Sequence, residues 1–253
     1  MPDQVFSGRT ALVTGSSQGI GCAVATTLGV RGTSVTLNYP LEQDAANAQA
    51  AVRRIQDAGG QATAIQADIS KLADIARLFD EAEAAFGPLD FVVNNVGRGG
   101  VRTPIADTTE AQFDEVMGLN AKACFFVLQQ AARRVRDNGR IIAVSSSITS
   151  VPAAGLAPYA GSKAAVELFC KVLAKEVGHR GITVNAVSPG MTKTEGLLAH
   201  GPRPERVEMM KGLTPLGRLA DAQDVADVIV MLLGQDAHWI TAQNIKAGGG
   251  AFS

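Results

Sequence analysis

Tyr159 and Lys163, four residues apart, are the side chains of this sequence best suited to proton transfer. Good helix formers surround them, so both side chains are expected to project from one helix face about one turn apart. A phenol titrates at about 10 and is a poor base at neutral pH. An ammonium about 5 Å away, at an effective dielectric of about 20, favours the phenolate by about 3 kcal/mol and lowers the phenol pKa by roughly two units. The spacing therefore predicts a tyrosine able to exchange a proton with a substrate.

A serine stands where a substrate would meet this pair. Ser146 comes just after the apolar run 141–144, which predicts a buried strand. Substrates of open α/β sheets bind at the carboxyl ends of the strands. Ser145 and Ser147 flank Ser146, and because only the alignment of the strand favours the middle residue, either neighbour remains an alternative.

A glycine-rich turn precedes both features in the chain. Residues 14–21 read Thr-Gly-Ser-Ser-Gln-Gly-Ile-Gly, directly after the first expected strand and at the start of an expected helix. Glycines let the backbone approach a pyrophosphate, and a helix N-terminus offers free N–H groups and partial positive charge. An isolated turn of this kind is equally well an ordinary tight turn. Its position after the first strand favours a dinucleotide site.

Short apolar runs alternate with longer amphipathic stretches along the chain, which is typical of βα units. Strands are expected at 11–13, 34–37, 62–66, 91–93, 140–144, 183–187 and 239–245. A helical repeat over 75–86 stops at Gly87-Pro88, and Thr109-x-x-Gln112 predicts a capping box that opens another helix. Right-handed crossovers between such units give an α/β fold, a doubly wound Rossmann-type parallel sheet of about seven strands with helices on both faces.

Length and composition limit the other classes of function. The 253 residues suit a single domain, 1–253, and the stretch without clear periodicity predicts a substrate lid at about 190–217. Lys and Arg number 23 against 24 Asp and Glu, so no basic excess predicts nucleic-acid binding. No apolar run approaches the roughly 18 residues of a membrane span, and no signal peptide is expected at the start, so a cytoplasmic location is expected. Cys22, Cys124 and Cys170, and His179, His200 and His238, lack the spacing of a disulfide framework or metal site.

The glycine spacing of 14–21 is TGxxxGxG and resembles the cofactor motif of the short-chain dehydrogenase/reductase family, in particular its single-domain, 3-oxoacyl-[acyl-carrier-protein] reductase-like members. The resemblance covers essentially the whole chain. Its further motifs occur in the family's order: Asn-Asn-Val-Gly at 94–97, Asn120, Ser146, Tyr159-x-x-x-Lys163 and Ser188-Pro189-Gly190.

This resemblance implies hydride transfer between a nicotinamide cofactor and a ketone or secondary alcohol. Ser146 would hydrogen-bond the substrate oxygen, and Tyr159 would transfer its proton. Lys163 would hold the nicotinamide ribose and tune the phenol, and Asn120 would complete the catalytic tetrad through a water linked to that lysine. The four-residue interval favours carbonyl or alcohol chemistry over the enoyl-reductase branch. The alternative is a catalytically silent NAD(P)-binding regulatory or scaffold protein, which typically lacks the tyrosine or lysine.

The resemblance also implies the cofactor contacts. They are Gly15, Ser17, Gln18, Gly19, Ile20, Gly21, Asn38, Asp68, Ile69, Asn95, Gly97, Tyr159, Lys163, Pro189, Gly190 and Thr192. Thr194 is the alternative to Thr192 as the partner of the carboxamide, and Asp68 could equally cap the helix that follows it. Asn38 carries no charge that would repel a 2′-phosphate, so NADP(H) is favoured over NAD(H), although Gln18 stands where many NADP-using relatives have a cation.

The substrate pocket is expected to be apolar. Its expected lining is Arg98 to Val101, Ile148, Val151, Met191, Leu197, Leu198, Met209, Met210 and Leu213. Such a lining suits a hydrophobic small-molecule carbonyl or alcohol, although the lid residues could instead pack the lid's own helix. The family resemblance further implies a homotetramer that uses the helices around 111–135 and 159–177 and the last strand.

Overall fold

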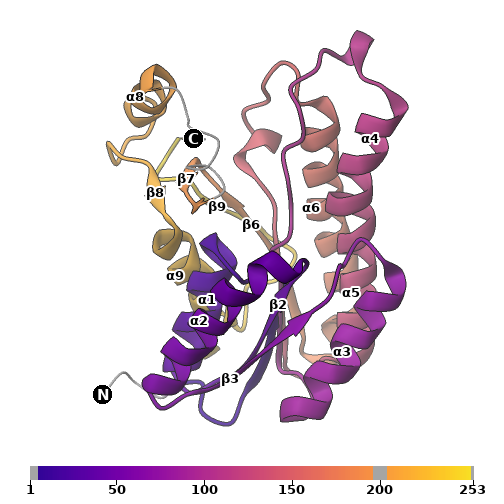
Figure 1. Cartoon of the computed structure of the whole chain (residues 1–253), viewed down its shortest axis with the longest axis vertical. Helices are drawn as coiled ribbons and strands as arrows, with labels where there is room; N and C mark the ends of the chain where they lie inside the picture. The colour runs from indigo at the N-terminus through magenta and orange to yellow at the C-terminus, as the bar shows by residue number, and fades with distance from the viewer. Residues whose placement is uncertain (1–4, 196–203, 252–253) are drawn as a thin grey trace.

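A seven-stranded, wholly parallel sheet forms the centre of the protein, as a computed structural model that describes residues 5–195 and 204–251 shows (Figure 1). The strand order is β3-β2-β1-β4-β5-β6-β9. The strands are β1 (Thr10–Val13), β2 (Ser34–Tyr39), β3 (Gln61–Gln66), β4 (Phe91–Asn94), β5 (Arg140–Val144), β6 (Thr183–Pro189) and β9 (Asn244–Ala247). The chain runs outward from β1 to β3 and returns to β4 beside β1. The strand order therefore reverses between β1 and β4, where an open sheet of this kind binds its ligand.

Helices cover both faces of the sheet. On one face lie α1 (Gly19–Val30), α2 (Ala45–Asp57) and α9 (Ala222–Leu233), and on the other α3 (Leu72–Phe86), α5 (Ala123–Arg134) and α6 (Ala157–Val177) (Figure 1). Beyond the carboxyl ends of the strands lie α4 (Glu110–Met117), α8 (Pro204–Gly212) and a small parallel sheet of β7 (Thr192–Lys193) and β8 (Ala220–Asp221). Short helical turns complete the connections: η1 (Glu42–Asp44), η2 (Ile105–Asp107), η3 (Gly118–Lys122), η4 (Ser147–Thr149), η5 (Gly178–Arg180) and η6 (Gln235–Ala237).

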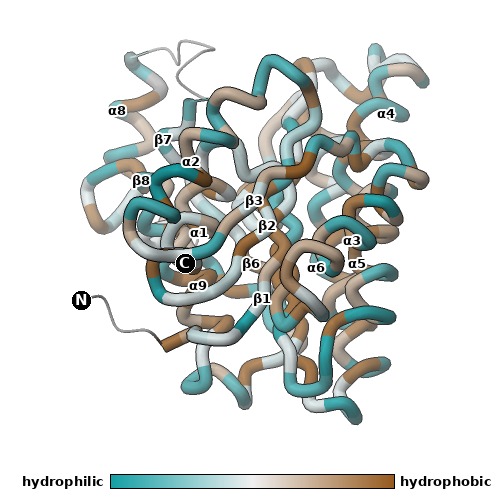
Figure 2. The backbone as a smooth tube through the Cα atoms, turned by 60° about the horizontal axis from the view of Figure 1, so that its bottom comes forward, coloured by the Kyte–Doolittle hydropathy of each residue, from teal (hydrophilic) through white to brown (hydrophobic). Residues whose placement is uncertain are grey.

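The period of two along each strand divides the core between the two helical layers. Leu12, Val92 and Ile141 pack with α3, α5 and α6, whereas their neighbours Val93 and Ile142 pack with α1, α2 and α9. Because both faces of the central strands are buried, these strands are continuous apolar runs in the sequence. The hydropathy of the tube in Figure 2 follows this division, with hydrophobic segments in the sheet and hydrophilic ones on the outer loops and helix faces.

The helix boundaries follow the local signals in the sequence. α3 ends at Phe86, where Gly87 adopts a left-handed φ of 86°. α4 begins with the expected capping box, in which Thr109 and Gln112 satisfy each other's backbone N–H groups. The doubly wound architecture, a parallel sheet between two helical layers, is confirmed.

The bounds predicted from the sequence for the last strand are wrong. It spans Asn244–Ala247 instead of 239–245 and pairs with β6 from Ala186 onward. Trp239 is 89% exposed, and Ala242 has a left-handed φ of 59°, so this apolar segment forms a turn after η6. Strand length here depends on the register with β6, which a run of apolar residues does not determine.

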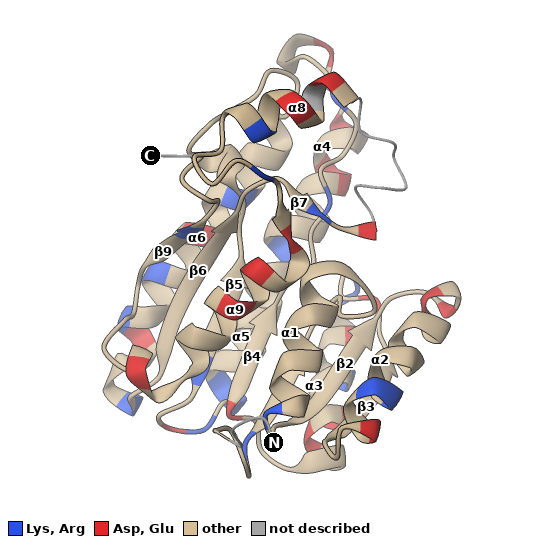
Figure 3. Cartoon of the chain, turned by 90° about the vertical axis from the view of Figure 1, so that its left-hand side faces the viewer, with Lys and Arg blue, Asp and Glu red and all other residues tan. Residues whose placement is uncertain are grey.

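Charged residues of both signs lie mainly on the helices and loops around the sheet (Figure 3), in keeping with the balanced composition. Across the described ranges, no helix combines the length and apolarity needed to span a lipid bilayer.

Candidate active site

The residues singled out by the sequence converge on the carboxyl ends of the central strands. The glycine turn joins β1 to α1, Asn95 and Gly97 follow β4, and Ser146 follows β5. Tyr159 and Lys163 lie in the first two turns of α6, which packs against β5 and β6. Three crossovers thus bring distant segments to the point where the strand order reverses.

The Tyr159 phenol lies near the Ser146 hydroxyl. Burial raises the pKa of the Tyr159 phenol above its ordinary value, and a hydrogen bond with the Ser146 side chain acts in the opposite direction. Ser146 has extended backbone angles (φ −163°, ψ 150°), and its hydroxyl oxygen accepts a hydrogen bond from the Ile148 N–H at 3.3 Å. The chain turn that follows β5 therefore presents the Ser146 hydroxyl to the phenol.

Lys163 is almost completely buried, with 2% of its surface exposed. Its Nζ donates a hydrogen bond to the Val144 carbonyl at 2.9 Å, and burial lowers its pKa to about 8. The sequence analysis expected the ammonium to lower the phenol pKa, and that expectation is wrong for this structure, where the pKa of Tyr159 is raised. The reason is desolvation, which penalises the charged form of both groups.

Asn120 ties the loop after β4 to the helices. It lies in η3, a π-helical turn between α4 and α5, and such turns are frequent at functional sites. Its side chain accepts from the Arg98 N–H and donates to the Arg98 carbonyl, both at 2.9 Å, and donates to Ser162 Oγ at 3.1 Å. A Cβ on Gly97 would lie 2.5 Å from Lys163 Nζ and 3.4 Å from Asn120 Oδ1. Gly97 thus adjoins the lysine amine and the Asn120 amide.

The glycine turn has the close backbone approach that a dinucleotide needs. Gly15 and Gly19 have left-handed φ values of 58° and 59°, and a Cβ on Gly21 would lie 2.5 Å from the Gly15 carbonyl oxygen. Asn95 Nδ2 donates to that carbonyl at 2.9 Å. Asn38 is fully engaged with the protein, because its Oδ1 accepts from the Gly15 N–H and its Nδ2 donates to the Ala67 carbonyl. Asn38 therefore stabilises the glycine turn through the Gly15 N–H.

The N-terminus of α1 already holds an anion. Glu195 Oε2 accepts a hydrogen bond from the Gly19 N–H at 2.9 Å. Gln18, the residue before the helix, provides no side-chain cap. A carboxylate at this position is stabilised by the helix dipole and the free N–H groups, as a phosphate would be. The turn therefore fits a dinucleotide diphosphate. No sequence signal links Glu195 to Gly19, because 176 positions separate them.

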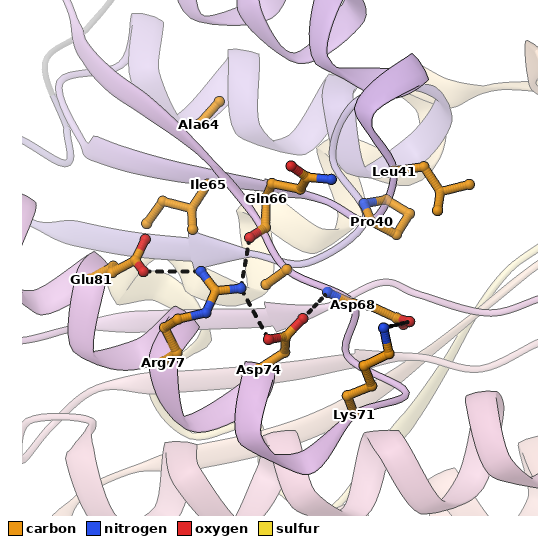
Figure 4. Close-up of a pocket in the computed structure, with 11 residues that line it drawn as sticks. Pro40, Leu41, Ala64, Ile65, Gln66, Asp68, Lys71, Asp74, Arg77 and Glu81 are labelled. Carbon is orange, nitrogen blue, oxygen red and sulfur yellow. Dashed lines mark hydrogen bonds and ion pairs between the residues drawn. The ribbon is translucent and has the colours of Figure 1, made fainter.

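At the expected adenine end, the Asp68 side chain caps the chain that follows it. Its Oδ1 accepts from the Ser70 N–H and hydroxyl, and its Oδ2 lies 3.6 Å from Lys71 Nζ (Figure 4). Ile69 beside it is buried. A pocket of about 590 Å³ opens here between β3 and α3, and Figure 4 shows Arg77 reaching from α3 to the Gln66 carbonyl at the sheet edge. Arg77 also pairs with carboxylates of its own helix, so this pocket offers no unpaired arginine to a ligand.

At the expected nicotinamide end, Pro189 completes β6, and Gly190 follows it with its N–H bonded to the Ala247 carbonyl. The Thr192 hydroxyl donates back to the Gly190 carbonyl at 3.0 Å. Thr194, the alternative, lies against Gly19, where a Cβ would meet the Thr194 methyl at 3.3 Å. Thr194 therefore adjoins the glycine turn, whereas the Thr192 hydroxyl is bonded within its own loop.

A cavity of about 30 Å³ lies directly beside Tyr159. Its lining includes Gly99, Gly100, Val101, Val116 and Leu156. Among the other expected pocket residues, Ile148 is buried, Val151, Met209 and Leu213 are exposed, and Leu197 and Leu198 lie outside the described residues. The expected lid region contains β7 and α8. Arg98, expected in the pocket lining, is exposed and paired with Glu115.

The histidines do not form a metal centre within the described part of the chain. His179 and His238 are exposed there, and His200 lies outside it. No group of three histidine, cysteine or carboxylate side chains in the described residues is arranged to hold a metal ion.

Comparison with known proteins matches nearly the whole chain. A family model described as "Enoyl-(Acyl carrier protein) reductase" matches residues 15–251. A hydroxynaphthalene reductase-like protein of Metarhizium brunneum is 41% identical, with 97% of this chain and 96% of that protein covered. The structure of the angucycline C-6 ketoreductase LanV with bound NADP is 36% identical, with a TM-score of 0.90 over 98% of this chain and 97% of that one.

A short chain dehydrogenase from Burkholderia cenocepacia, solved in complex with NADP, is 35% identical, with a TM-score of 0.91 over 98% of this chain and 100% of that one. These relatives are named as reductases or dehydrogenases, and they share the length and the fold of this chain. The chain belongs to the short-chain dehydrogenase/reductase family and is an NAD(P)-dependent oxidoreductase acting on carbonyl or alcohol groups.

Proposed function

We propose that this enzyme reduces ketones with NADPH, using Asn120, Ser146, Tyr159 and Lys163 as its catalytic tetrad. The observation that carries the proposal is the grouping of the Ser146 hydroxyl, the Tyr159 phenol and, one helical turn further along α6, the buried Lys163 amine. The three groups lie at the carboxyl ends of β5 and the start of α6, beside the glycine turn.

The pKa directions favour reduction at neutral pH. A phenol with a raised pKa keeps its proton, so Tyr159 is poised to donate that proton to a carbonyl oxygen. Ser146 donates a second hydrogen bond to the same oxygen as negative charge develops on it. Lys163, with a pKa of about 8, exchanges protons readily near neutral pH and can restore the phenol through Asn120 and water. When bound, the nicotinamide supplies the hydride.

The cofactor would lie across the glycine turn. Gly15, Ser17, Gln18, Gly19, Ile20 and Gly21 would hold the diphosphate, and Asp68 and Ile69 would hold the adenine. Asn95, Gly97, Tyr159, Lys163, Pro189, Gly190 and Thr192 would hold the nicotinamide riboside, with Asn38 supporting Gly15. Asn38 and Tyr39 end β2 without a carboxylate that would repel a 2′-phosphate, and two similar structures contain NADP. Both features support NADPH as the partner.

The proposed substrate class rests on the relatives. A hydroxynaphthalene reductase-like protein and an angucycline ketoreductase are named for fused aromatic ring systems. The cavity beside Tyr159 combines glycine and aliphatic residues with Thr103, Thr108, Gln112 and Glu115, and at about 30 Å³ it is smaller than a ring system, so the relatives alone support the substrate class. We therefore propose a ring ketone fused to an aromatic system as substrate, covered by the segment 190–217 of a single catalytic domain.

We also propose that the enzyme is a homotetramer located in the cytoplasm. Phe125, Leu168 and Val172 are exposed on α5 and α6, and Met231 and Trp239 are exposed on α9 and after it. Two separate apolar areas on different elements suit two kinds of subunit interface. Light scattering should give a mass four times that of the chain, and a monomer would contradict this assembly.

The test uses 2-tetralone as substrate and follows nicotinamide absorbance with NADPH and with NADH. We expect reduction with NADPH, and we expect Tyr159→Phe to lower kcat by about a hundredfold or more while the Kd for NADPH, which many other residues support, changes little. Near-normal turnover of the folded Tyr159→Phe variant would contradict the tetrad. A strong preference for NADH would contradict the cofactor assignment alone.

A further inference from the structure

A carboxylate outside the proposed tetrad lies beside it on the same helix. Glu167 follows Lys163 by four residues and Tyr159 by eight, so the three side chains lie along one face of α6. Glu167 is half-buried, and no ion-pair partner is found for it within 5–195 and 204–251. Hydroxyl groups from the ends of β5 and β6 surround its Oε1 atom instead.

Two of these hydroxyls lie close enough for strong hydrogen bonds. Ser145 Oγ is 2.7 Å from Glu167 Oε1 and 3.2 Å from the Lys163 carbonyl oxygen. Thr149 Oγ1 is 2.7 Å from the same carboxylate oxygen and 3.0 Å from the Ser146 carbonyl oxygen. Each hydroxyl has a single proton, and the shorter, charge-assisted bond is the stronger one. Both protons therefore go to Glu167.

The third hydroxyl, on β6, lies between the carboxylate and the edge strand β9. Ser188 Oγ is 2.8 Å from Asn244 Oδ1 in β9 but 3.4 Å from Glu167 Oε1. Its proton goes to Asn244, so the contact with Glu167 is weak. The firm attachment of Glu167 is to residues 145 and 149.

Ser145 and Thr149 flank Ser146 in the chain. Ser145 directly precedes it, and Thr149 ends the short helical turn that follows it. Because the residues on both sides of Ser146 are hydrogen-bonded to Glu167, and Thr149 also bonds the Ser146 carbonyl, the backbone of Ser146 and the direction of its side chain are held in place. Resting on the proposed function, we infer that Glu167 is a positioning residue, whose carboxylate holds Ser145 and Thr149 and thereby directs the Ser146 hydroxyl at the phenol of Tyr159.

The first test measures catalysis. Glu167→Gln keeps the shape of the side chain but loses the charge that strengthens both hydrogen bonds, so kcat for 2-tetralone should fall about tenfold, with the KM for NADPH and the melting temperature little changed. Glu176→Gln, an exposed site of the same helix, is the matched control and should behave as wild type. Wild-type kcat in the folded Glu167→Gln variant would overturn the inference. If wild type itself reduces no ketone, the proposed function fails, and the second test decides the inference.

The second test needs no substrate and keeps the Glu167 charge. The chain has two tyrosines, so Tyr39→Phe leaves Tyr159 as the single phenol for titration by ultraviolet absorbance. Adding Ser145→Ala and Thr149→Val removes both hydroxyls from Glu167 and releases Ser146. The pKa of Tyr159 should then rise by about half a unit, because the phenolate loses a hydrogen-bond donor. If the pKa of Tyr159 stays unchanged in the folded variant that carries Ser145→Ala and Thr149→Val, the inference is overturned. This test remains decisive even if Glu167→Gln does not fold.

Discussion

Gly97→Ala tests how closely the position of the Lys163 amine controls catalysis. The added Cβ would lie 2.5 Å from Nζ and 3.2 Å from Cε of Lys163, whereas ordinary contact begins at 3.4 Å. The flexible end of the lysine can yield, so the amine would retreat by about 0.9 Å and give up its 2.9 Å bond to the Val144 carbonyl. Gly97 has no left-handed φ, so the alanine itself adds no backbone strain.

We expect Gly97→Ala to lower kcat much more than it lowers the stability of the fold. Loss of one hydrogen bond costs about 1 kcal/mol, which lowers the melting temperature of a chain of this size by about 2–4 °C. A displacement of about 1 Å in a reacting group can cost about a hundredfold in rate, equivalent to about 2.7 kcal/mol in the activation barrier. The protein should therefore remain folded while kcat falls by about that factor.

The assay is ketone reduction at saturating NADPH, with thermal unfolding measured on the same samples. Gly161→Ala is the matched control, since Gly161 lies exposed in α6 between Tyr159 and Lys163 and a Cβ there meets nothing within 4 Å. The control should keep wild-type kcat and gain up to about 1 kcal/mol of stability from helix propensity. A folded Gly97→Ala variant with kcat near that of wild type would refute the reasoning.

Two further perturbations address charges around the site. Glu195→Gln removes the negative charge that accepts a hydrogen bond from the Gly19 N–H and would compete with the diphosphate. NADPH should therefore bind about fivefold more tightly in a fluorescence titration. Unchanged or weaker binding would contradict this competition. Lys163→Met should raise the free energy of unfolding by up to about 3 kcal/mol at neutral pH, because burial lowers the lysine pKa from 10.5 to about 8. Between these two pKa values the folded wild type binds fewer protons than the unfolded chain. The stability gained by Lys163→Met should therefore shrink as pH rises from about 8 to 10.5. A stability gain that is independent of pH would argue against a desolvated amine.

Local features of the sequence were enough to predict the architecture and to select the residues proposed for the site. Continuous apolar runs become the central strands because both of their faces are covered, and the Gly87 stop and the Thr109 cap determine helix ends through contacts within a few residues. The glycine turn is likewise local, since its left-handed angles depend on residue type. The four-residue step from Tyr159 to Lys163 places both on one face of α6 whatever surrounds them.

Tertiary structure decided the properties that depend on distant neighbours. The spacing of Tyr159 and Lys163 suggested a lowered phenol pKa, but burial raises it, because desolvation depends on everything packed around the pair. The helical spacing of Glu167 was visible in the sequence, yet the hydroxyls of Ser145 and Thr149 reach its carboxylate only when β5 ends beside α6.

The same distinction explains the Asn38 amide and the Glu195 carboxylate. Asn38 is used by Gly15 and Ala67, and Glu195 by Gly19, through contacts that only the folded backbone brings together. Residue types and spacing along the chain thus determined which groups this enzyme has available for chemistry. The packing of its helices on the sheet determined where each group points and how readily it takes or gives a proton, because hydrogen bonds and desolvation act through space and not along the sequence.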